Sequence, residues 1–591
     1  MKPAQRRWVL PDCVPLPDFP PLLGQVLAVR GFTVASAGEF LRRGVFLDPF
    51  GLPDMERAVE VVGKAIAART RIAVYGDYDV DGVTACALLT RALRAAGADV
   101  LPWIPNRMTD GYGLHASALA ELGAQGVGCT ITVDCGTSSV EAAASRPTSM
   151  ALVITDHHLP RRADGTAPPL APADAVINPK RDGSTYGFDG LAGAGVAWKL
   201  VQALETAGAV PAGSAFSLMP YAALGTVADV MPLEGENRKL VQEGLPMVAA
   251  GAYPGIAALC AVGGISAATL RATDVAYGLA PRINAAGRME DARRALELCL
   301  SEDPDECHAL AQQLELQNQE RKTALAKALE AAEARVEEME EAPAIVLGDR
   351  SWPMGIVGLV AGRLAERYGC PAFIASLDPH ESKGSARSAG DIHLVDVLDQ
   401  AASTMLRYGG HKLAAGFSLE EKHFPEFTEA ILAAVEQRWK GRSRERVFRI
   451  DITLPLGEAN AHLMEQVAAL EPFGQGNAEP LVAFMGCEIV ESRCFGAGDA
   501  HVRMTVGGAG NFLEAVAFNR PGLAVHLYPG RIVDLCGTLS VNRWRGEERM
   551  QLLIRDVQPA TGAVHAGGGT GASLGAAQSG NLRQGEPSAA S

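Results

Sequence analysis

The stretch Tyr75–Thr84, which reads YGDYDVDGVT, places three aspartates at alternate positions. Carboxylates so close together repel one another unless a cation lies among them. Further carboxylates and imidazoles follow in the motifs DCG, DHH and GTVAD, which completes a candidate set of Asp77, Asp79, Asp81, Asp134, Asp156, His157, His158 and Asp229. Such a set suits Mn²⁺ or Mg²⁺, and a bridging aspartate could hold two ions. Two ions favour displacement at phosphorus, because one generates hydroxide and both stabilise charge on the attacking and leaving oxygens.

A calcium loop or a simple helix cap accounts less well for the aspartate cluster. The segment DYDVDG matches the start of a calcium-binding EF-hand loop, but Leu88 stands where that loop needs a glutamate. A β-like run, RIAVY, also precedes the cluster instead of a helix. One aspartate would be enough to cap the following helix, so capping does not explain the other carboxylates.

Rival enzyme classes lack their own motifs in this sequence. An HExxH helix and cysteine ligands, typical of a zinc protease, are missing. The phosphate-binding motif GxxxxGK[ST] is missing as well, so nucleotide-driven motor activity is not indicated. In GLAGAGVAW, Trp198 occupies the place of the third glycine of a dinucleotide-binding loop.

Short apolar strands must position the candidate residues. The runs RIAVY, CTITV and ALVIT each end at one of the motifs, and helical apolar spacing lies between them. This alternation predicts a parallel α/β sheet. Because ligands of such sheets bind beyond the carboxyl ends of the strands, we expect the motifs to converge on one edge.

The rest of the chain predicts a multidomain α/β protein. Strong helix formers over 304–341 predict one long connecting helix, a second α/β unit follows, and from about Val447 short β-like runs predict a barrel of the OB type. The expected parts are an N-terminal cap (1–50), a first α/β domain (51–300), a connecting helix (301–342), a second α/β domain (343–440), an OB-like domain (445–560) and a disordered tail (561–591).

Composition restricts location and partners. The 591 residues carry a formal net charge of −15, so a nucleic-acid partner would need a local basic groove. Eleven cysteines are scattered without CxxC pairs, which suits a reducing compartment. We find neither a secretory signal pattern nor an apolar run of the roughly 20 residues that span a bilayer, so we expect a cytoplasmic protein without a membrane partner.

As an ordered set, the motifs resemble the DHH phosphoesterase superfamily. DYDVDG, DCG, DHH and GTVAD resemble its catalytic domain, and GSARS (384–388) with GGHKLAAGFS (409–418) resemble the DHH-associated domain. The segments PNRMTDGYGL (105–114), RINAAGRM (282–289) and EPFGQGNAEP (471–480) narrow the resemblance to the branch of single-strand-specific 5′→3′ DNA exonucleases. The resemblance extends from about residue 40 to 558.

The resemblance implies roles for individual residues. The metal ligands of the family correspond to Asp77, Asp79, Asp81, Asp134, His157 and Asp229. We expect His158 to contact the scissile phosphate, Asp156 to orient an imidazole, and His411 to stabilise the transferring phosphoryl group. For His411, a purely structural role is the alternative.

The resemblance also implies substrate contacts. We expect Ser385 and Arg387, with Arg107, to hold the 5′-terminal phosphate. A patch of Arg282, Asn284 and Arg288 is expected on the strand backbone, with salt bridges inside the first domain as the alternative for both arginines. In the OB-like domain, Trp544 between Arg543 and Arg545 could stack on a base, or could be an ordinary hairpin tip.

Together these features predict a Mn²⁺- or Mg²⁺-dependent exonuclease on single-stranded DNA. It would release 5′-mononucleotides from the 5′ end in recombination and repair, alongside a helicase and the single-strand-binding protein. Two alternatives remain. One is a DHH phosphoesterase for short oligoribonucleotides or cyclic dinucleotides, against which the β-rich domain counts. The other is a replication-fork scaffold with a dead site, against which the intact aspartates and His157 count.

Overall fold

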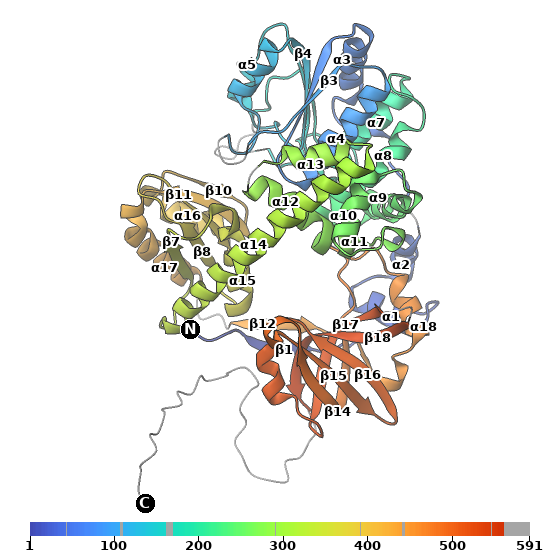
Figure 1. Cartoon of the computed structure of the whole chain (residues 1–591), viewed down its shortest axis with the longest axis vertical. Helices are drawn as coiled ribbons and strands as arrows, with labels where there is room; N and C mark the ends of the chain where they lie inside the picture. The colour runs from blue at the N-terminus through green and yellow to red at the C-terminus, as the bar shows by residue number, and fades with distance from the viewer. Residues whose placement is uncertain are drawn as a thin grey trace, which may run out of the picture. The chain divides into compact units, whose positions relative to one another are not determined.

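The computed structural model describes residues 1–42, 44–106, 110–160, 169–289, 291–390, 392–439, 444–544 and 547–560. The predicted disordered tail, 561–591, lies outside the described residues. Contacts between residues divide the chain into two compact units (Figure 1). The aspartate unit comprises Ser36–Lys327 and the short segment Leu470–Ala478. The barrel unit comprises Met1–Ala35, Ala328–Ala469 and the chain from Glu479 onward.

A five-stranded parallel sheet organises the aspartate unit. Its strands are β2 (Arg71–Gly76), β3 (Val100–Trp103), β4 (Val127–Val133), β5 (Ala151–Thr155) and β6 (Ala175–Ile177), in the order β3-β2-β4-β5-β6. The strands are short apolar runs, as expected where both faces are buried. The chain continues from β2 to β3 on one side and returns to β4 on the other. The crevice beyond β2 and β4 is therefore the switch point at which such sheets bind ligands.

Helices cover both faces of this sheet (Figure 1). Alternate strand residues enter two separate apolar cores, one with Ile72 and Val74 and one with Ala73 and Tyr75. The first core includes α3 (Met55–Ala67), α4 (Val80–Ala95), α7 (Gly193–Thr206) and α8 (Ser214–Ala228). The second includes α5 (Ala116–Ala124) and α6 (Val140–Ala144). The sheet is thus held rigidly from both sides, and its carboxyl edge provides fixed attachment points.

Further helices complete the aspartate unit and lead out of it. They are α9 (Gly235–Gly244), α10 (Pro254–Val262), α11 (Ala272–Asp274), α12 (Ala280–Met289) and α13 (Arg293–Leu300). The long helix α14 runs from Pro304 to Glu338, and its 35 residues extend about 52 Å. Pro304 and two acidic residues in the first turn favour the start of this helix. Its residues after Lys327 belong to the barrel unit.

The segment Leu470–Ala478 is tied to the aspartate unit by main-chain hydrogen bonds. The Arg238 guanidinium, 4% exposed, donates to the carbonyls of Leu470 and Glu471 at 3.1 and 2.8 Å. The amide of Leu233 donates to the carbonyl of Gln475 at 2.8 Å. The loop that follows Asp229 is therefore held by residues far along the chain.

The first part of the barrel unit is a mixed five-stranded sheet, the fold expected of the second α/β domain. It contains β7 (Ile345–Asp349), β8 (Ala372–Ser376), β9 (Ser382–Arg387), β10 (Arg407–Gly410) and β11 (Ala414–Leu419), in the order β10-β11-β9-β8-β7. Only the β7–β8 pair is parallel. The accompanying helices are α15 (Met354–Tyr368), α16 (Leu394–Gln400) and α17 (Phe424–Trp439).

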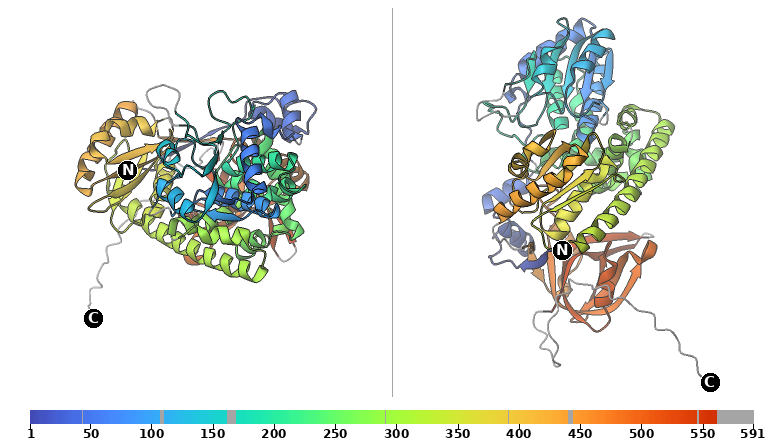
Figure 2. Two further views of the ribbon diagram at one scale, coloured as in Figure 1. Left: turned by 90° about the horizontal axis from the view of Figure 1, so that it is seen from above. Right: turned by 90° about the vertical axis from the view of Figure 1, so that its left-hand side faces the viewer.

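The second part of the barrel unit is a closed barrel (Figure 2). The strands β13 (Ile452–Leu454), β14 (Val482–Phe495), β15 (His501–Gly508), β16 (Asn511–Ala517), β18 (Glu547–Pro559) and β17 (Ile532–Trp544) lie in that order, and pairing of β14 with β17 closes the ring. The predicted fold class, two α/β domains with a long helix and an OB-like barrel, is confirmed.

The N-terminal residues also contribute a strand to the barrel unit. Strand β1 (Gln5–Val9) pairs in parallel with β12 (Glu445–Arg449), and the helices α1 (Pro21–Val29) and α2 (Val34–Leu41) follow. No single described helix is long and apolar enough to cross a membrane. One pair of helices, Gly235–Ala250 and Pro254–Val262, meets that length and composition together but is bent by 88°.

Candidate active site

The aspartates of DYDVDG lie at the carboxyl end of β2, where the chain enters α4. Asp79 is the N-cap of that helix, and its Oδ1 accepts hydrogen bonds from the amides of Asp81 and Gly82 at 2.9 and 3.1 Å. A Cβ on Gly82 would lie 2.5 Å from main-chain atoms of Asp77. Only glycine allows this close turn, so the cluster serves helix capping through Asp79 and leaves its other carboxylates available.

Asp81 is fixed by the start of another helix. Its two carboxylate oxygens accept hydrogen bonds from the amides of Gly193 and Ala194, at 2.6 and 2.8 Å, in the first turn of α7. A Cβ on Gly225 of α8 would lie 2.5 Å from Asp81 Oδ1. Asp81 is 1% exposed, so its position is determined by backbone groups on two helices.

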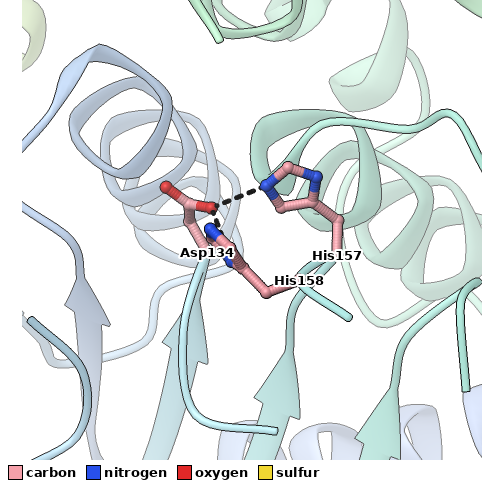
Figure 3. Close-up of side chains that lie close together, drawn as sticks. All are labelled: Asp134, His157 and His158. Atoms are coloured by element: carbon pink, nitrogen blue, oxygen red, sulfur yellow. Dashed lines mark ion pairs between the residues drawn. The ribbon is translucent and has the colours of Figure 1, made fainter. Parts of the chain in front are cut away.

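Asp134, His157 and Asp229 converge on one point of the crevice. His157 Nε2 lies 3.2 Å from Asp134 Oδ1, 3.4 Å from Asp229 Oδ2 and 3.8 Å from Asp81 Oδ2. Figure 3 shows the rings of His157 and His158 turned toward the Asp134 carboxylate. Asp134 has a φ of 63°, a left-handed conformation that aspartate tolerates and that turns its side chain at the end of β4.

The donor atoms at this point fit a divalent cation. Asp134 Oδ1, His157 Nε2 and Asp229 Oδ2 are buried without a hydrogen-bond partner, which costs free energy unless a ligand binds them. The candidate ligand atoms form three overlapping groups within 4.8 Å, namely Asp134–His157–His158, Asp81–His157–Asp229 and Asp77–Asp79–Asp134. Oxygen-rich groups with an imidazole suit Mn²⁺ or Mg²⁺.

The electrostatics of the site also favour a cation. Burial, followed by the charge of Asp79, raises the pKa of Asp81 to about 7. Burial and the charge of Asp81 raise the pKa of Asp229 to about 8, and the same two causes raise the pKa of Asp134 well above its ordinary value. Burial lowers the pKa of His157 to about 3, so this imidazole is neutral and its Nε2 can bind a metal.

His158 belongs to a separate hydrogen-bonded group. Its Nδ1 lies 2.9 Å from Asp156 Oδ1 and 2.9 Å from the hydroxyl of Tyr112. Burial alone would lower the pKa of His158, but the hydrogen bond and charge of Asp156 raise it to about 9. The Asp156 carboxylate also accepts hydrogen bonds from the amides of Thr137, His157 and His158, at 2.9, 2.7 and 3.0 Å. These contacts hold the DHH motif in one conformation.

The residues expected on the strand backbone have different surroundings. Arg282 is 7% exposed, and its Nε lies 2.6 Å from Glu315 of α14, which favours the internal salt bridge over a strand contact. Asn284 is partly exposed on α12. A Cβ on Gly287 of this helix would lie 2.7 Å from the carbonyl of Tyr78, so α12 packs against the aspartate turn. Arg107 and the side chain of Arg288 lie outside the described residues.

In the barrel unit, Ser385 and Arg387 lie together on β9. The Arg387 guanidinium donates to Ser385 Oγ at 2.8 Å and to the carbonyl of Ala386 at 2.8 Å. Burial lowers the pKa of Arg387, and its described contacts include no carboxylate. His411 is exposed in the turn between β10 and β11. The side chains of Trp544, Arg543 and Arg545 lie outside the described residues.

Several residues of the site carried no sequence signal of their own. Tyr112 lies within the motif PNRMTDGYGL, but its contact with His158 was not expected. Thr137 and Asn178 join strand ends by hydrogen bonds that involve main-chain groups. Such bonds cannot be predicted from a pattern of residue types.

Comparison with protein families gives three matches in chain order. Residues 71–226 match the DHH family N-terminal domain, residues 341–438 match the DHHA1 domain, and residues 450–556 match the RecJ OB domain. The first match contains Asp77–Asp81, Asp134 and Asp156–His158 of the crevice and ends three residues before Asp229, and the second contains Ser385 and Arg387.

Curated relatives align with most of the chain. The single-stranded-DNA-specific exonuclease RecJ of Escherichia coli is 34% identical over 586 residues, covering 94% of this chain and 99% of the relative. RecJ of Bacillus subtilis is 33% identical over 543 residues, covering 91% of this chain and 68% of the relative.

Solved structures give the same result. RecJ of Thermus thermophilus in complex with Mn²⁺ superposes with a TM-score of 0.77 at 31% identity, over 94% of this chain and 80% of that chain. The same protein in complex with Mg²⁺ gives a TM-score of 0.70 at 30% identity, over 94% and 78%. The ordered domains, the alignments over nearly the whole chain and the shared fold show that this chain belongs to the RecJ family of single-stranded-DNA-specific exonucleases.

Proposed function

We propose that this chain, as a RecJ-family exonuclease, degrades single-stranded DNA from the 5′ end and releases 5′-mononucleotides with Mn²⁺ or Mg²⁺ as cofactor. The observation that carries the proposal is the convergence of Asp134, His157 and Asp229 at the sheet edge, with Asp81 beside them. Asp134 Oδ1, His157 Nε2 and Asp229 Oδ2 are buried without hydrogen-bond partners, an arrangement that a divalent cation would satisfy.

We assign Asp77, Asp79, Asp81, Asp134, His157 and Asp229 as the metal ligands. All six occur in the overlapping groups of candidate ligand atoms, and Asp134 and His157 each occur in two groups, which suits two neighbouring ions. When bound, the ions would neutralise phosphate charge and lower the pKa of the attacking water. The backbone amides of Gly193 and Ala194 would keep the Asp81 carboxylate in place during turnover.

His158 would contact the scissile phosphate as a cation. Asp156 occupies its Nδ1, so the proton on Nε2 is free to be donated to a phosphate oxygen. With a pKa of about 9, the imidazole is charged at neutral pH and would stabilise negative charge that develops on the phosphate. Asp156 fixes the ring orientation and remains ionised.

The substrate contacts are proposed on the second domain and on α12. Ser385 and Arg387 would hold the 5′-terminal phosphate, because a half-buried guanidinium beside a hydroxyl suits an anion. Arg107 would join them, and His411 would stabilise the transferring phosphoryl group. We retain Asn284 and Arg288 as contacts to the strand backbone, since α12 packs against Tyr78.

The barrel and the cellular setting extend the proposal. An OB barrel is a common platform for single strands, and base stacking on Trp544 remains part of the proposal. We place the protein in the cytoplasm and expect the single-strand-binding protein and a helicase as partners, because a strand must be unwound before it can be degraded.

The direct test is digestion of 5′-phosphorylated single-stranded DNA with Mn²⁺. Asp81→Ala should lower the rate at least about 1,000-fold, because several kcal/mol of charge stabilisation would be lost. Asp99→Ala, at an exposed aspartate of the same unit, is the matched control. If only di- to tetranucleotides or RNA were cut in a length series, the alternative phosphoesterase function would replace this proposal.

A further inference from the structure

The turn after β6 lies at the same sheet edge as the carboxylate crevice. Strand β6 pairs in parallel with β5, whose carboxyl end bears the DHH motif. The chain then reads INPKRD, so Asn178, Lys180 and Arg181 leave the sheet directly beside Asp156–His158. Neither the metal ligands nor the proposed substrate contacts include these residues.

Asn178 joins three strand ends by hydrogen bonds. Its side-chain amide donates to the hydroxyl of Thr137 at 3.0 Å and to the carbonyl of His158 at 2.9 Å. Its side-chain oxygen accepts the amide of Lys180 at 2.8 Å. Asn178 is fully buried, so both its donors and its acceptor are used inside the protein.

Asn178 thereby links Lys180 to the DHH motif by two hydrogen bonds. Thr137 completes the ring, because its amide donates to Asp156 Oδ2 at 2.9 Å. The main chain at Lys180 and the main chain at His158 are therefore held at a fixed separation. A residue on this turn has a defined position relative to the crevice.

The side chains of Lys180 and its neighbour Arg181 differ in their partners. The Arg181 guanidinium donates to Asp54 at 2.7 Å and to the carbonyl of Val176 at 2.8 Å, so it is a structural group. No ion pair or side-chain hydrogen bond joins Lys180 to the described chain, and this residue is partly exposed.

From this geometry we propose that the turn Asn178–Lys180 is a further part of the active site. Lys180 contacts a phosphate of the substrate strand, and Asn178 is the positioning residue that holds Lys180 and the DHH motif together. An ammonium on a fixed turn suits a phosphate oxygen, which accepts a charge-assisted hydrogen bond. The inference rests on the proposed nuclease reaction.

The test measures kcat and KM on 5′-phosphorylated single-stranded DNA with saturating Mn²⁺, at several salt concentrations. Lys180→Ala should lower kcat/KM about 10- to 100-fold, the range for loss of a hydrogen bond to a charged group. The slope of log(kcat/KM) against log salt should become shallower by about 0.7, the value for one contact to a single-strand phosphate. Lys180→Arg should keep the slope of the wild type.

Matched variants separate contact from folding. Arg181→Ala should lower the thermal midpoint and leave the salt slope unchanged. Thr137→Val should lower kcat, whereas Thr137→Ser keeps the hydroxyl and should restore it. The Mn²⁺ concentration for half-maximal activity should stay within about twofold of wild type in the Lys180 variants, since Lys180 is not a ligand.

The outcomes are distinguishable. Inactivity of the wild type would contradict the proposed function itself. An active wild type with Lys180→Ala within twofold of it, or with an unchanged salt slope, would overturn the role of Lys180. Equal kinetics of Thr137→Val and Thr137→Ser would overturn the positioning role of the hydrogen-bonded turn.

Discussion

The carboxylate of Asp81 accepts a 2.6 Å hydrogen bond from the amide of Gly193, which lies 112 residues further along the chain. This bond, with that from Ala194, uses the first turn of α7 to hold a buried anion. The same carboxylate lies 3.8 Å from the ring of His157. One residue therefore connects the helix that supports the crevice with the atoms that would bind metal.

The first prediction concerns the space around Asp81. Gly225→Ala would place a Cβ 2.5 Å from Asp81 Oδ1 and 2.6 Å from the Cβ of Ala194. Because both neighbours are buried and cannot move away easily, Asp81 should be displaced. We expect the Mn²⁺ concentration for half-maximal activity to rise by about tenfold or more, by analogy with loss of groups that orient metal ligands.

Gly63→Ala is the control for this substitution. Gly63 lies inside α3 with no atom near its would-be Cβ, so alanine should stabilise the helix by about 0.5–1 kcal/mol. Activity titrations with Mn²⁺ and thermal unfolding of both variants check the pair. Wild-type Mn²⁺ dependence in Gly225→Ala would show that Asp81 is not held in the way described.

The second prediction is a pH dependence of stability in the presence of a chelator. The pKa values of Asp81 and Asp229, raised by burial to about 7 and about 8, exceed the ordinary value of 3.8, and that of His158, about 9, exceeds 6.5. Between pH 6.5 and 8 the folded protein therefore binds protons that the unfolded chain has released. The free energy of unfolding should decrease as pH rises through this window.

Below pH 6.5 a further group acts in the opposite sense. The pKa of His157 is lowered by burial to about 3, so its contribution to stability increases as pH rises from 3 to 6.5. Above pH 6.5 this compensation fades, because the unfolded imidazole loses the rest of its proton over about one further pH unit. Urea unfolding at half-unit steps from pH 6.5 to 8 checks the slope, and saturating Mn²⁺ should reverse it, because the cation competes with protons. Equal slopes with and without Mn²⁺ would contradict the assignment of these groups as ligands.

The third prediction concerns Tyr112. Tyr112→Phe removes the hydroxyl that lies 2.9 Å from His158 Nδ1 and leaves Asp156 as the partner of that nitrogen. We expect kcat to fall about 3- to 10-fold, the effect of losing one hydrogen bond of ordinary strength. Tyr277→Phe, at a residue that is 83% exposed, should leave kcat unchanged. If Tyr112→Phe kept the kcat of the wild type, the hydroxyl would have no role in the reaction, and Tyr112 would only pack against the ring of His158.

The fourth prediction separates the 5′-phosphate site from the metal centre. Arg387→Ala should reduce the preference for 5′-phosphorylated over 5′-hydroxyl DNA by about 10- to 100-fold, because a charged contact to the phosphate is lost. Mn²⁺ dependence should not change. Arg350→Ala removes an exposed arginine that pairs with Glu421, and it should retain the full preference. Loss of activity on both substrates in equal proportion would contradict a 5′-phosphate role for Arg387.

The sequence predicted the framework of the site well because strand ends are visible in a sequence. The runs before Asp77, Asp134 and Asp156 are apolar and β-rich, and parallel strands bring their carboxyl ends to one edge. The ordered motifs also resembled RecJ, and the comparisons confirm that family. The apolar pattern of the strands and the rule for parallel sheets were therefore sufficient to predict where these residues lie.

Contacts made through the main chain could not be predicted in this way. Asn178 forms hydrogen bonds with the main-chain carbonyl of His158 and the main-chain amide of Lys180. Every residue has a carbonyl, and nearly every residue has an amide, so the residue types give no sign of these contacts. The salt bridge of Arg282 with Glu315 joins α12 to α14, and only their packing decides whether Arg282 faces a carboxylate or a DNA strand. Asp79 caps a helix and also lies among the candidate ligands, so capping and metal binding are compatible roles for one aspartate cluster.

The segment Leu470–Ala478 limits how this protein can be divided into modules. The carbonyls of Leu470 and Glu471 accept hydrogen bonds from the buried Arg238 guanidinium. The carbonyl of Gln475 accepts one from the amide of Leu233, in the loop after Asp229. A fragment cut after the long helix would remove two of the three carbonyls that accept hydrogen bonds from this buried guanidinium and leave only that of Phe40. In an exchange of barrels between relatives the junction therefore belongs after Ala478, because these nine residues pack with the aspartates rather than with the barrel they precede.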